Sequence, residues 1–348
     1  MSEGDVLAGA PHPRSREHLF GHAAHEADLM ADWRAGRMPH ALLIGGPEGI
    51  GKATLAYRIA RFVLAGGQAG RDQHDFFVSQ RDPVFRQVAA MSHPDLLVLR
   101  RAAESGEDKV PTVIPAEMVR KVRPFFGSTA ASGGWRVCIV DAVDELNAFG
   151  ANALLKTLEE PPPRALFLLV CHAPGRVLPT IRSRTRLLRL RELHEPDVLS
   201  ALDDLKQDAE LDEATLPAAA AAAGGSVRRA LVLARGEGLE VRVATQRLLD
   251  QLPQVRAEDL HGLGARLQGD RAGGLDLFIE AVTDWIAAQT LSGADAGAGA
   301  GPHERGRLVR LSEVWEKVRR AGAEADTFNL DRKALVFRIF TALAEAAR

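Results

Sequence analysis

The stretch GGPEGIGKATLA, at residues 45–56, carries residue types that bind phosphate. It matches the pattern G-x-x-x-x-G-K-[ST] at Gly46, Gly51 and Lys52 but not at the last position. In such a loop, backbone N–H groups at the start of a helix point at the phosphates of a nucleotide, and the lysine reaches the β- and γ-phosphates. We therefore predict that Gly46, Gly49, Gly51 and Lys52 form a phosphate cradle.

The position that should carry a hydroxyl group for a magnesium ion is Ala53. The nearest hydroxyl group comes one residue later, at Thr54, which is rotated by about 100° on a helix of 3.6 residues per turn. We expect Thr54 to point elsewhere, as an ordinary helix residue. Magnesium binding should therefore be weakened while the phosphate cradle stays largely intact.

A second acidic element ends the apolar stretch RVCIVD at Asp141, which is the place for the aspartate that works with magnesium in P-loop ATPases. Active ATPases of this kind carry a glutamate directly after it, to orient the attacking water, and here Ala142 stands instead. Asp144 and Glu145 lie beyond the strand end, where we expect solvated acids. Alanine at both motifs predicts a site that binds ATP or ADP at most, without hydrolysis.

Strands and helices alternate over the first half of the chain. Strands are predicted at HALLIGG, DLLVLRR, WRVCIVDA, ALFLLVCHA and TRLLRL, and helices at HEADLMADWRAGR, KATLAYRIARFVLAG, PAEMVRKVRPFF and ANALLKTLEEP. Strands that are apolar on both faces favour a parallel sheet covered by helices. The first twenty residues suggest a polar, loosely ordered lead-in.

The strand pattern ends near Leu190, and helical patterns follow. The stretch ATLPAAAAAAGGSVRRALVLARG predicts a helix, a glycine break and a second helix, and LSGADAGAGAGPHERG predicts a flexible loop between later helices. We expect an α/β nucleotide-binding-like domain over residues 1–190. A small helical lid over residues 191–238 and an all-helical C-terminal domain over residues 239–348 should follow.

Composition narrows the class of protein. The net charge of −2 over 348 residues excludes a global basic field for nucleic acid, so DNA contact would need a local basic face or partner subunits. Cys138 and Cys171 lie in predicted strands, which indicates buried free thiols in a reducing compartment. No C-x-x-C pair occurs, which excludes a cysteine-rich zinc site. Without a secretory signal or an apolar run of about 18 residues, we expect a cytoplasmic protein away from membranes.

Three stretches together resemble the bacterial clamp-loader branch of the AAA+ proteins: GRMPHALLIGGPEGIGKATLA, RVCIVDAVDELNAFGANALLKTLEEPP and LPTIRSRTRLLRLREL. The resemblance runs from about Leu19 to Arg235, and the C-terminal third matches only in length and helical character. It implies an α/β P-loop AAA+ module with flanking helices, a helical lid, and a collar domain that packs with its counterparts in a hetero-oligomeric ring.

The resemblance also implies roles for two arginines. In this family an S-R-C tripeptide supplies an arginine to the neighbouring subunit's ATP site, and Ser183, Arg184 and Thr185 stand here with the cysteine changed. Arg184 is thus the expected trans-acting arginine finger; the alternative is one more surface arginine in a run of five. Arg228, in GGSVRRAL, matches the family's sensor-2 arginine and would touch a bound phosphate or stand solvated at a helix start.

Other family features differ here. The polar sensor-1 residue falls at Cys171 or His172, where a threonine pair is usual in motor subunits. Many members hold structural zinc through four cysteines, but residues 66–93 contain none, so no zinc is expected. The stretch PAEMVRKVRPFF brings the basic residues Arg120, Lys121 and Arg123 together; it would face duplex DNA in the ring or form a solvated basic face.

The resemblance implies a non-motor subunit of the DNA polymerase III clamp loader, which helps load the sliding clamp on primed DNA. Its partners would be the other loader subunits, primed DNA and, indirectly, the clamp. Alone it would hydrolyse little or no ATP. The alternative is an active P-loop ATPase motor, in a clamp loader or a related remodelling enzyme, which Lys52 and Asp141 support and Ala53 and Ala142 oppose. A small-substrate P-loop kinase is disfavoured by the lid sequence and the S-R element.

Overall fold

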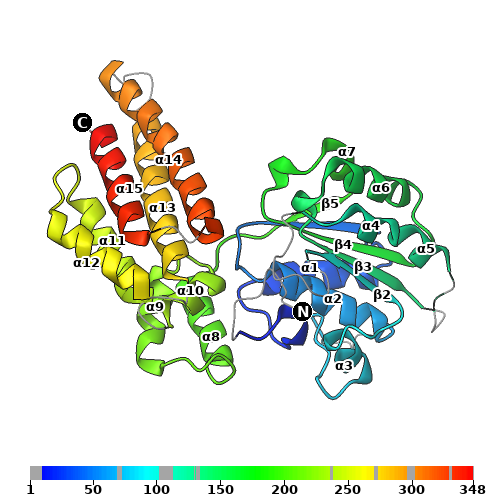
Figure 1. Ribbon diagram of the computed structural model, residues 1–348. Helices are drawn as coiled ribbons and strands as arrows, with labels where there is room; N and C mark the ends of the chain where they lie inside the picture. Colours follow the sequence, from blue (N-terminus) through cyan, green and yellow to red (C-terminus); the bar gives the residue numbers. More distant parts are fainter. Residues whose placement is uncertain are drawn as a thin grey trace. The chain divides into compact units, whose positions relative to one another are not determined.

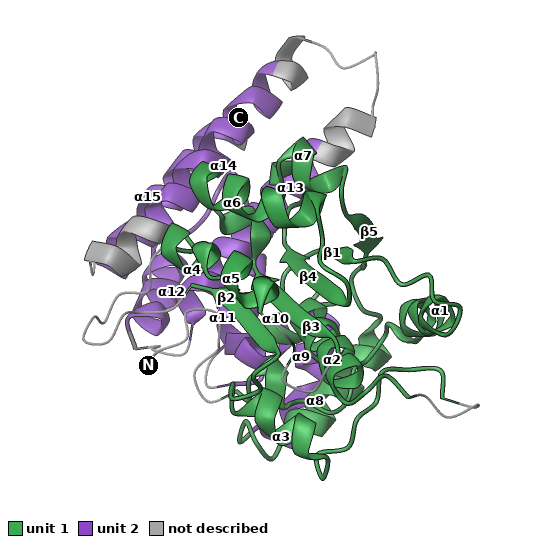
Figure 2. Ribbon diagram, turned by 90° about the vertical axis from the view of Figure 1, so that its right-hand side faces the viewer, with its two compact units in different colours: residues 1–210, 224–228 green, residues 211–223, 229–348 purple. Residues whose placement is uncertain are grey.

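The structure, a computed structural model, describes residues 10–68, 73–101, 113–128, 130, 134–235, 238–269, 273–295, 302–328 and 331–347. The chain divides into two compact units (Figure 2). Unit 1 comprises Met1–Glu210 and Gly224–Arg228, and unit 2 comprises Leu211–Ala223 and Arg229–Arg348. The finer division into three domains stays a prediction.

A five-stranded sheet forms the centre of unit 1 (Figure 1). Its strands are β1 (Ala41–Gly45), β2 (Leu96–Arg100), β3 (Arg136–Asp141), β4 (Ala165–Cys171) and β5 (Arg186–Arg189). Every pairing is parallel, in the order β2-β3-β4-β1-β5. This confirms the predicted parallel sheet and its five strands. Because all strands run the same way, the carboxyl ends of β1, β3 and β4 meet at one edge.

Helices cover both faces of this sheet (Figure 1). Alternate side chains of β1 reach opposite faces: Leu42 and Ile44 join one apolar cluster, and Ala41 and Leu43 join the other. Unit 1 contains α1 (Ala23–Arg34), α2 (Lys52–Leu64), α3 (Pro83–Ala89), α4 (Ala116–Arg120), α5 (Val122–Gly127), α6 (Ala148–Glu159), α7 (Pro179–Arg182) and α8 (Glu195–Leu205).

The stretch PAEMVRKVRPFF forms two helices rather than the single helix that its pattern predicts. The α4 helix ends at Arg120, and α5 begins at Val122. Pro124 lacks the N–H group that a continuous helix would need at this point, whereas the first turn of a new helix tolerates proline. The chain therefore restarts the helix at Lys121.

The N-terminal segment is held by buried arginines of α2. Arg61 donates from Nη1 to the Arg14 carbonyl at 2.7 Å and from Nη2 to the Arg16 carbonyl at 2.6 Å. Arg58 donates to the carbonyl of Glu17. The expectation of a loosely ordered lead-in is therefore wrong for residues 10–20, because these hydrogen bonds hold the backbone carbonyls of this segment against α2. Residues 1–9 lie outside the described part.

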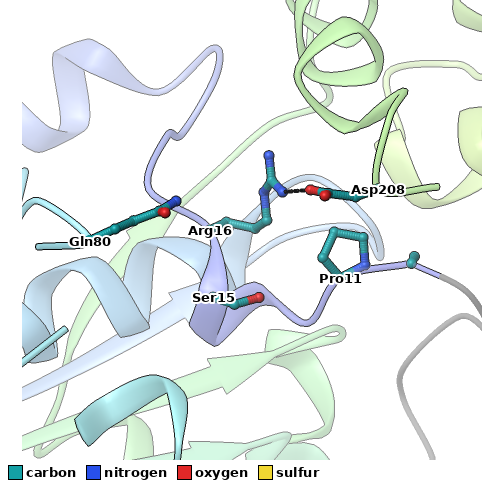
Figure 3. A pocket seen from close by; sticks show the side chains of 6 residues that line it. Pro11, Ser15, Arg16, Gln80 and Asp208 are labelled. Carbon is teal, nitrogen blue, oxygen red and sulfur yellow. Dashed lines mark hydrogen bonds and ion pairs between the residues drawn. The ribbon is translucent and has the colours of Figure 1, made fainter. Parts of the chain in front are cut away.

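The same segment reaches the end of α8. Arg16 pairs with Asp204 and, at 2.6 Å, with Asp208. Figure 3 shows Arg16 and Asp208 pointing toward one another in a hollow of about 500 Å³, whose lining residues are Ala10, Pro11, Ser15, Arg16, Gln80 and Asp208. Because its arginine and aspartate already neutralise each other, the hollow offers no uncompensated charge for a ligand.

A buried ion pair joins α1 to α2. Arg58 Nε lies 2.8 Å from Glu26 Oε1, and the two side chains are 3% and 4% exposed. Arg58 also contacts the half-exposed Asp75 at 3.1 Å. Burial raises the pKa of Glu26, and the Arg58 guanidinium opposes that shift. The pair thus supports the helix that begins at the phosphate loop.

Helices and their connections make up the described residues of unit 2. They are α9 (Leu216–Ala222), the end of α10 (Val227–Leu233), α11 (Gly238–Asp250), α12 (Ala257–Gly269), α13 (Gly274–Asp295), α14 (Pro302–Phe328) and α15 (Arg332–Ala347). In its core, α13 packs against α11 and α14, and α12 packs against α15. This confirms a helical C-terminal region. None of the described helices is long and apolar enough to cross a membrane.

The prediction of a flexible loop over LSGADAGAGAGPHERG is wrong at both ends of this stretch. Its first five residues continue α13 as far as Asp295, and α14 begins at Pro302. Alanine favours continuation of the helix, and proline suits the first position of the next one. Residues 296–301 lie outside the described part.

The buried pair of Glu26 and Arg58 generates a stability prediction. Glu26→Ala should lower the free energy of unfolding by about 3 kcal/mol, because it leaves Arg58 buried without its main counter-charge. Urea unfolding measures this. The matched control is Asp28→Ala on the exposed face of the same helix, which should change stability by about 0.5 kcal/mol or less. Equal losses in both variants would contradict a role for the buried pair.

Candidate nucleotide-binding site

The phosphate loop connects β1 to α2 and depends on glycine at several positions. Gly49 and Gly51 have φ values of +78° and +96°, in the left-handed region that side chains disfavour. A Cβ atom on Gly49 would lie 2.2 Å from Ser226 Oγ, and one on Gly46 would lie 2.5 Å from the carbonyl oxygen of Leu190. Only glycine permits both the turn and this close packing.

Lys52 is the first residue of α2, and its side chain reaches back to the phosphate loop that precedes it. The residue is 3% exposed, and its Nζ donates to the carbonyl of Pro47. Burial lowers the pKa of Lys52 to about 8, while the carboxylates of Glu48, Asp141 and Asp144 act in the opposite direction. Lys52 is therefore still a cation at neutral pH. The structure thus brings Lys52 and Asp141, both predicted site residues, into one electrostatic environment.

Two positions at this edge carry only a methyl group. Ala53 is the second residue of α2, and Ala142 is buried directly after β3. In P-loop ATPases, the residue after the lysine is a magnesium ligand. Neither alanine can bind a cation or orient a water molecule.

Asp144 and Glu145 are not the solvated acids that the sequence predicts. The Asp144 carboxylate accepts hydrogen bonds from the backbone N–H groups of His172, at 3.2 Å, and Ala173, at 2.9 Å. Glu145 pairs with Arg101 at 2.8 Å. The chain leaves the sheet after β4, so these N–H groups need a new acceptor, and Asp144 supplies it. The contact spans 28 residues of sequence, so no local pattern indicates it.

Cys171 ends β4 beside the phosphate loop. It pairs in register with Gly45 of β1, and its carbonyl accepts the Gly46 N–H at 3.2 Å. The pKa of its thiol is raised to about 12, mainly by burial. The thiol is therefore protonated at neutral pH and is not a nucleophile. Cys138 is likewise buried, with a raised pKa. The prediction of two buried free thiols is confirmed.

The Gly225–Arg228 segment packs directly on the phosphate loop. Ser226 Oγ donates to the Glu48 carbonyl at 3.0 Å, and the Val227 N–H donates to the Gly49 carbonyl at 2.9 Å. Arg228 Nε lies 3.1 Å from the Glu48 carboxylate. Arg228 is therefore next to the loop, as its family position implies, but contact with a bound phosphate stays a prediction. No sequence pattern indicates the role of Glu48, because its partner Arg228 is 180 residues away.

Arg184 has a different set of neighbours. Its Nη1 donates to the Thr180 carbonyl at 3.0 Å and to Ser183 Oγ at 3.1 Å, and its Nη2 lies 2.8 Å from the Glu159 carboxylate. None of these residues belongs to the phosphate loop of this chain. The structure does not bring Arg184 together with Lys52, and its role as a trans-acting arginine stays a prediction.

His22 is a residue of this region that sequence reasoning missed. It is buried, and its Nε2 lies 2.8 Å from the Ile50 carbonyl in the phosphate loop. Burial lowers the pKa of His22, and the nearby His25 adds to that effect, whereas the hydrogen bond to Ile50 and the Asp197 charge oppose it. A lone histidine before an amphipathic helix has no pattern that would reveal this contact.

Comparison with known proteins places the chain in a family. A family profile described as "DNA polymerase III, delta subunit" matches residues 21–194. The chain is 34% identical to DNA polymerase III subunit delta' of Escherichia coli (strain K12) over 244 residues, which is 70% of this chain and 68% of that protein. The chain belongs to this DNA polymerase III subunit family.

Other relatives match shorter parts. DNA polymerase III subunit delta' of Pseudomonas aeruginosa (strain PAO1) is 38% identical over 150 residues, covering 42% of this chain and 41% of that protein. DNA polymerase III subunit gamma/tau of Mycobacterium bovis is 31% identical over 221 residues, covering 63% of this chain and 36% of that protein.

Within the described residues, no group of three or more His, Cys, Asp or Glu side chains is arranged to hold a metal ion.

The buried His22 makes stability depend on pH. Its pKa is lowered in the folded state, so the unfolded state binds more protons as the pH falls below about 6.5. Stability should therefore decrease on acidification, and thermal unfolding between pH 7.5 and 5.5 should show a smaller decrease in His22→Gln than in the unchanged chain. Some decrease should remain, because burial also lowers the pKa of His93.

The control for this measurement is His194→Gln, which removes an exposed imidazole from the same unit. It should leave the pH dependence unchanged. If His22→Gln and the unchanged chain lost stability equally on acidification, His22 would not be the group responsible.

Proposed function

We propose that this chain is a non-motor subunit of a bacterial DNA polymerase III clamp loader. In that role it helps load the sliding clamp on primed DNA, within a ring of related subunits. Family membership and the delta' and gamma/tau relatives support the assignment to this complex. The observation that carries the non-motor role is a formed phosphate loop with alanine at both adjoining hydrolysis positions. Ala53 in α2 and Ala142 directly after β3 replace the polar residues of hydrolysis.

The residues of the loop fit a nucleotide phosphate but not a magnesium ion. Left-handed Gly49 and Gly51 and the buried cation of Lys52 suit an anion. A magnesium ion would need an oxygen ligand where Ala53 stands. Two backbone carbonyls of the loop, those of Glu48 and Gly49, already accept hydrogen bonds from the Gly225–Arg228 segment. The chain therefore binds ATP or ADP weakly at most and does not hydrolyse it.

The chemical contribution of the subunit is the Arg184 guanidinium. Its side chain is 36% exposed and contacts no residue of the chain's own phosphate loop. Presented to the γ-phosphate of a neighbouring subunit's ATP, a guanidinium stabilises the charge of the transition state, which is worth about 10³–10⁵ in rate in other systems. A rigid subunit that supplies this group completes its neighbour's site without a hydrolysis cycle of its own.

The isolated chain should not turn over Mg-ATP. Steady-state phosphate release should equal the background, and Lys52→Ala should leave it unchanged, because no catalytic step uses the lysine. Turnover that disappears in Lys52→Ala would favour the active motor instead. Equilibrium binding of ATP and ADP to the same samples would show whether the cradle holds nucleotide without hydrolysing it.

Arg184→Ala should lower DNA-stimulated ATP turnover in a reconstituted loader. The loss arises at the adjacent motor site, so the total decrease equals the share of turnover that this site contributes. Arg182→Ala is the matched control, since it removes an exposed arginine two residues away. Unchanged turnover in Arg184→Ala, with complex assembly intact by gel filtration, would reject the arginine-finger role.

A further inference from the structure

We propose that Glu159 is a positioning residue for Arg184, an inference that rests on the proposed function. Glu159 is the last residue of α6, and Arg184 follows α7, which packs beside α6 (Figure 1). Glu159 Oε1 lies 2.8 Å from Arg184 Nη2. The contact joins residues 25 positions apart and supplies the only carboxylate among the described contacts of this guanidinium.

Glu159 projects from a well-anchored point. Thr157 and Leu158, in the same last turn of α6, are 7% and 1% exposed. Glu160 and the three prolines at residues 161–163 follow, and this proline run prevents the helix from continuing. The negative end of the helix dipole lies at the same terminus and adds to the attraction for a cation. The backbone that carries the Glu159 carboxylate is therefore fixed in position, which favours a stable contact with Arg184.

The contacts of Arg184 define the plane of its guanidinium. The Glu159 carboxylate pairs with Nη2, while the Thr180 carbonyl and Ser183 Oγ both accept hydrogen bonds from Nη1. Ser183 Oγ in turn donates to the Thr180 carbonyl at 3.1 Å, which fixes the serine. Among the described contacts none uses Nε, so its N–H group is left for an incoming phosphate oxygen. These contacts hold the guanidinium without consuming all its donors.

Two effects of Glu159 oppose each other. Its negative charge weakens the attraction between Arg184 and a phosphate, whereas its hydrogen bond restricts a long, flexible side chain to one orientation. The side chains of Arg184 and Glu159 are 36% and 47% exposed, so solvent and salt screen the charge effect strongly. Orientation is not screened in this way, and it matters for a transition state with strict geometry. Positioning therefore dominates.

The experiment uses the clamp loader reconstituted with the full chain. Glu159→Ala should lower the Arg184-dependent part of DNA-stimulated turnover about tenfold, as expected from freeing an ordered arginine side chain. The decrease should appear in kcat with KM for ATP unchanged, because the guanidinium acts on the transition state. Glu159→Gln keeps an oxygen acceptor of the same length and should restore turnover in part.

Glu160→Ala is the matched control, because it removes the neighbouring carboxylate, which has no ion pair in the described part of the chain. It should leave turnover unchanged. Thermal unfolding of Glu159→Ala should match the unchanged chain closely, since exposed ion pairs contribute little to stability. If the complex with Glu159→Ala does not assemble, the same kcat measurement on the complex with Glu159→Gln tests the positioning role.

The outcomes separate this inference from the proposed function. If Arg184→Ala leaves turnover unchanged in an intact complex, the arginine-finger function itself fails. If Arg184→Ala lowers turnover but Glu159→Ala equals or exceeds the unchanged chain, only the positioning role fails. In an Arg184→Ala background, Glu159→Ala should have no further effect. An additional loss there would show that Glu159 acts independently of Arg184 and would overturn the inference.

Discussion

Parallel pairing of β1, β3 and β4 is the constraint on which the rest of unit 1 depends. It brings the ends of three strands to one edge of the sheet, so that the phosphate loop, Asp141 and Cys171 become neighbours although they are far apart in sequence. Lys52 then lies buried among carboxylates that partly offset the cost of its burial. The shape of a nucleotide site follows from this topology and does not require the chemistry of hydrolysis.

Long-range polar contacts hold that shape. Asp144 satisfies backbone N–H groups where the chain leaves β4, and His22 reaches the loop carbonyl of Ile50. Arg58 and Arg61 tie the N-terminal segment to α2. Each contact replaces water at a buried polar group, which is the condition under which hydrogen bonds matter most for stability. Such a framework suits a subunit whose proposed task is to present one arginine from a fixed position.

The five strands and the loop could be predicted from the sequence because their signals are local. Apolar runs such as ALFLLVC indicate strands buried on both faces, and glycines followed by Lys52 indicate a tight turn before a helix. The roles of Asp144, Glu48 and His22 could not be predicted, since their partners lie 28 to 180 residues away. The break at Lys121 was in principle visible, because Pro124 marks it.

The central claim is that this subunit contributes an arginine, rather than an ATPase site, to the complex. Its most direct test measures DNA-stimulated ATP turnover of the reconstituted loader with Lys52→Ala and Arg184→Ala introduced one at a time in this chain. We expect Lys52→Ala to retain the turnover of the unchanged complex and Arg184→Ala to lower it. Loss of turnover with Lys52→Ala, together with unchanged turnover with Arg184→Ala, would contradict the account.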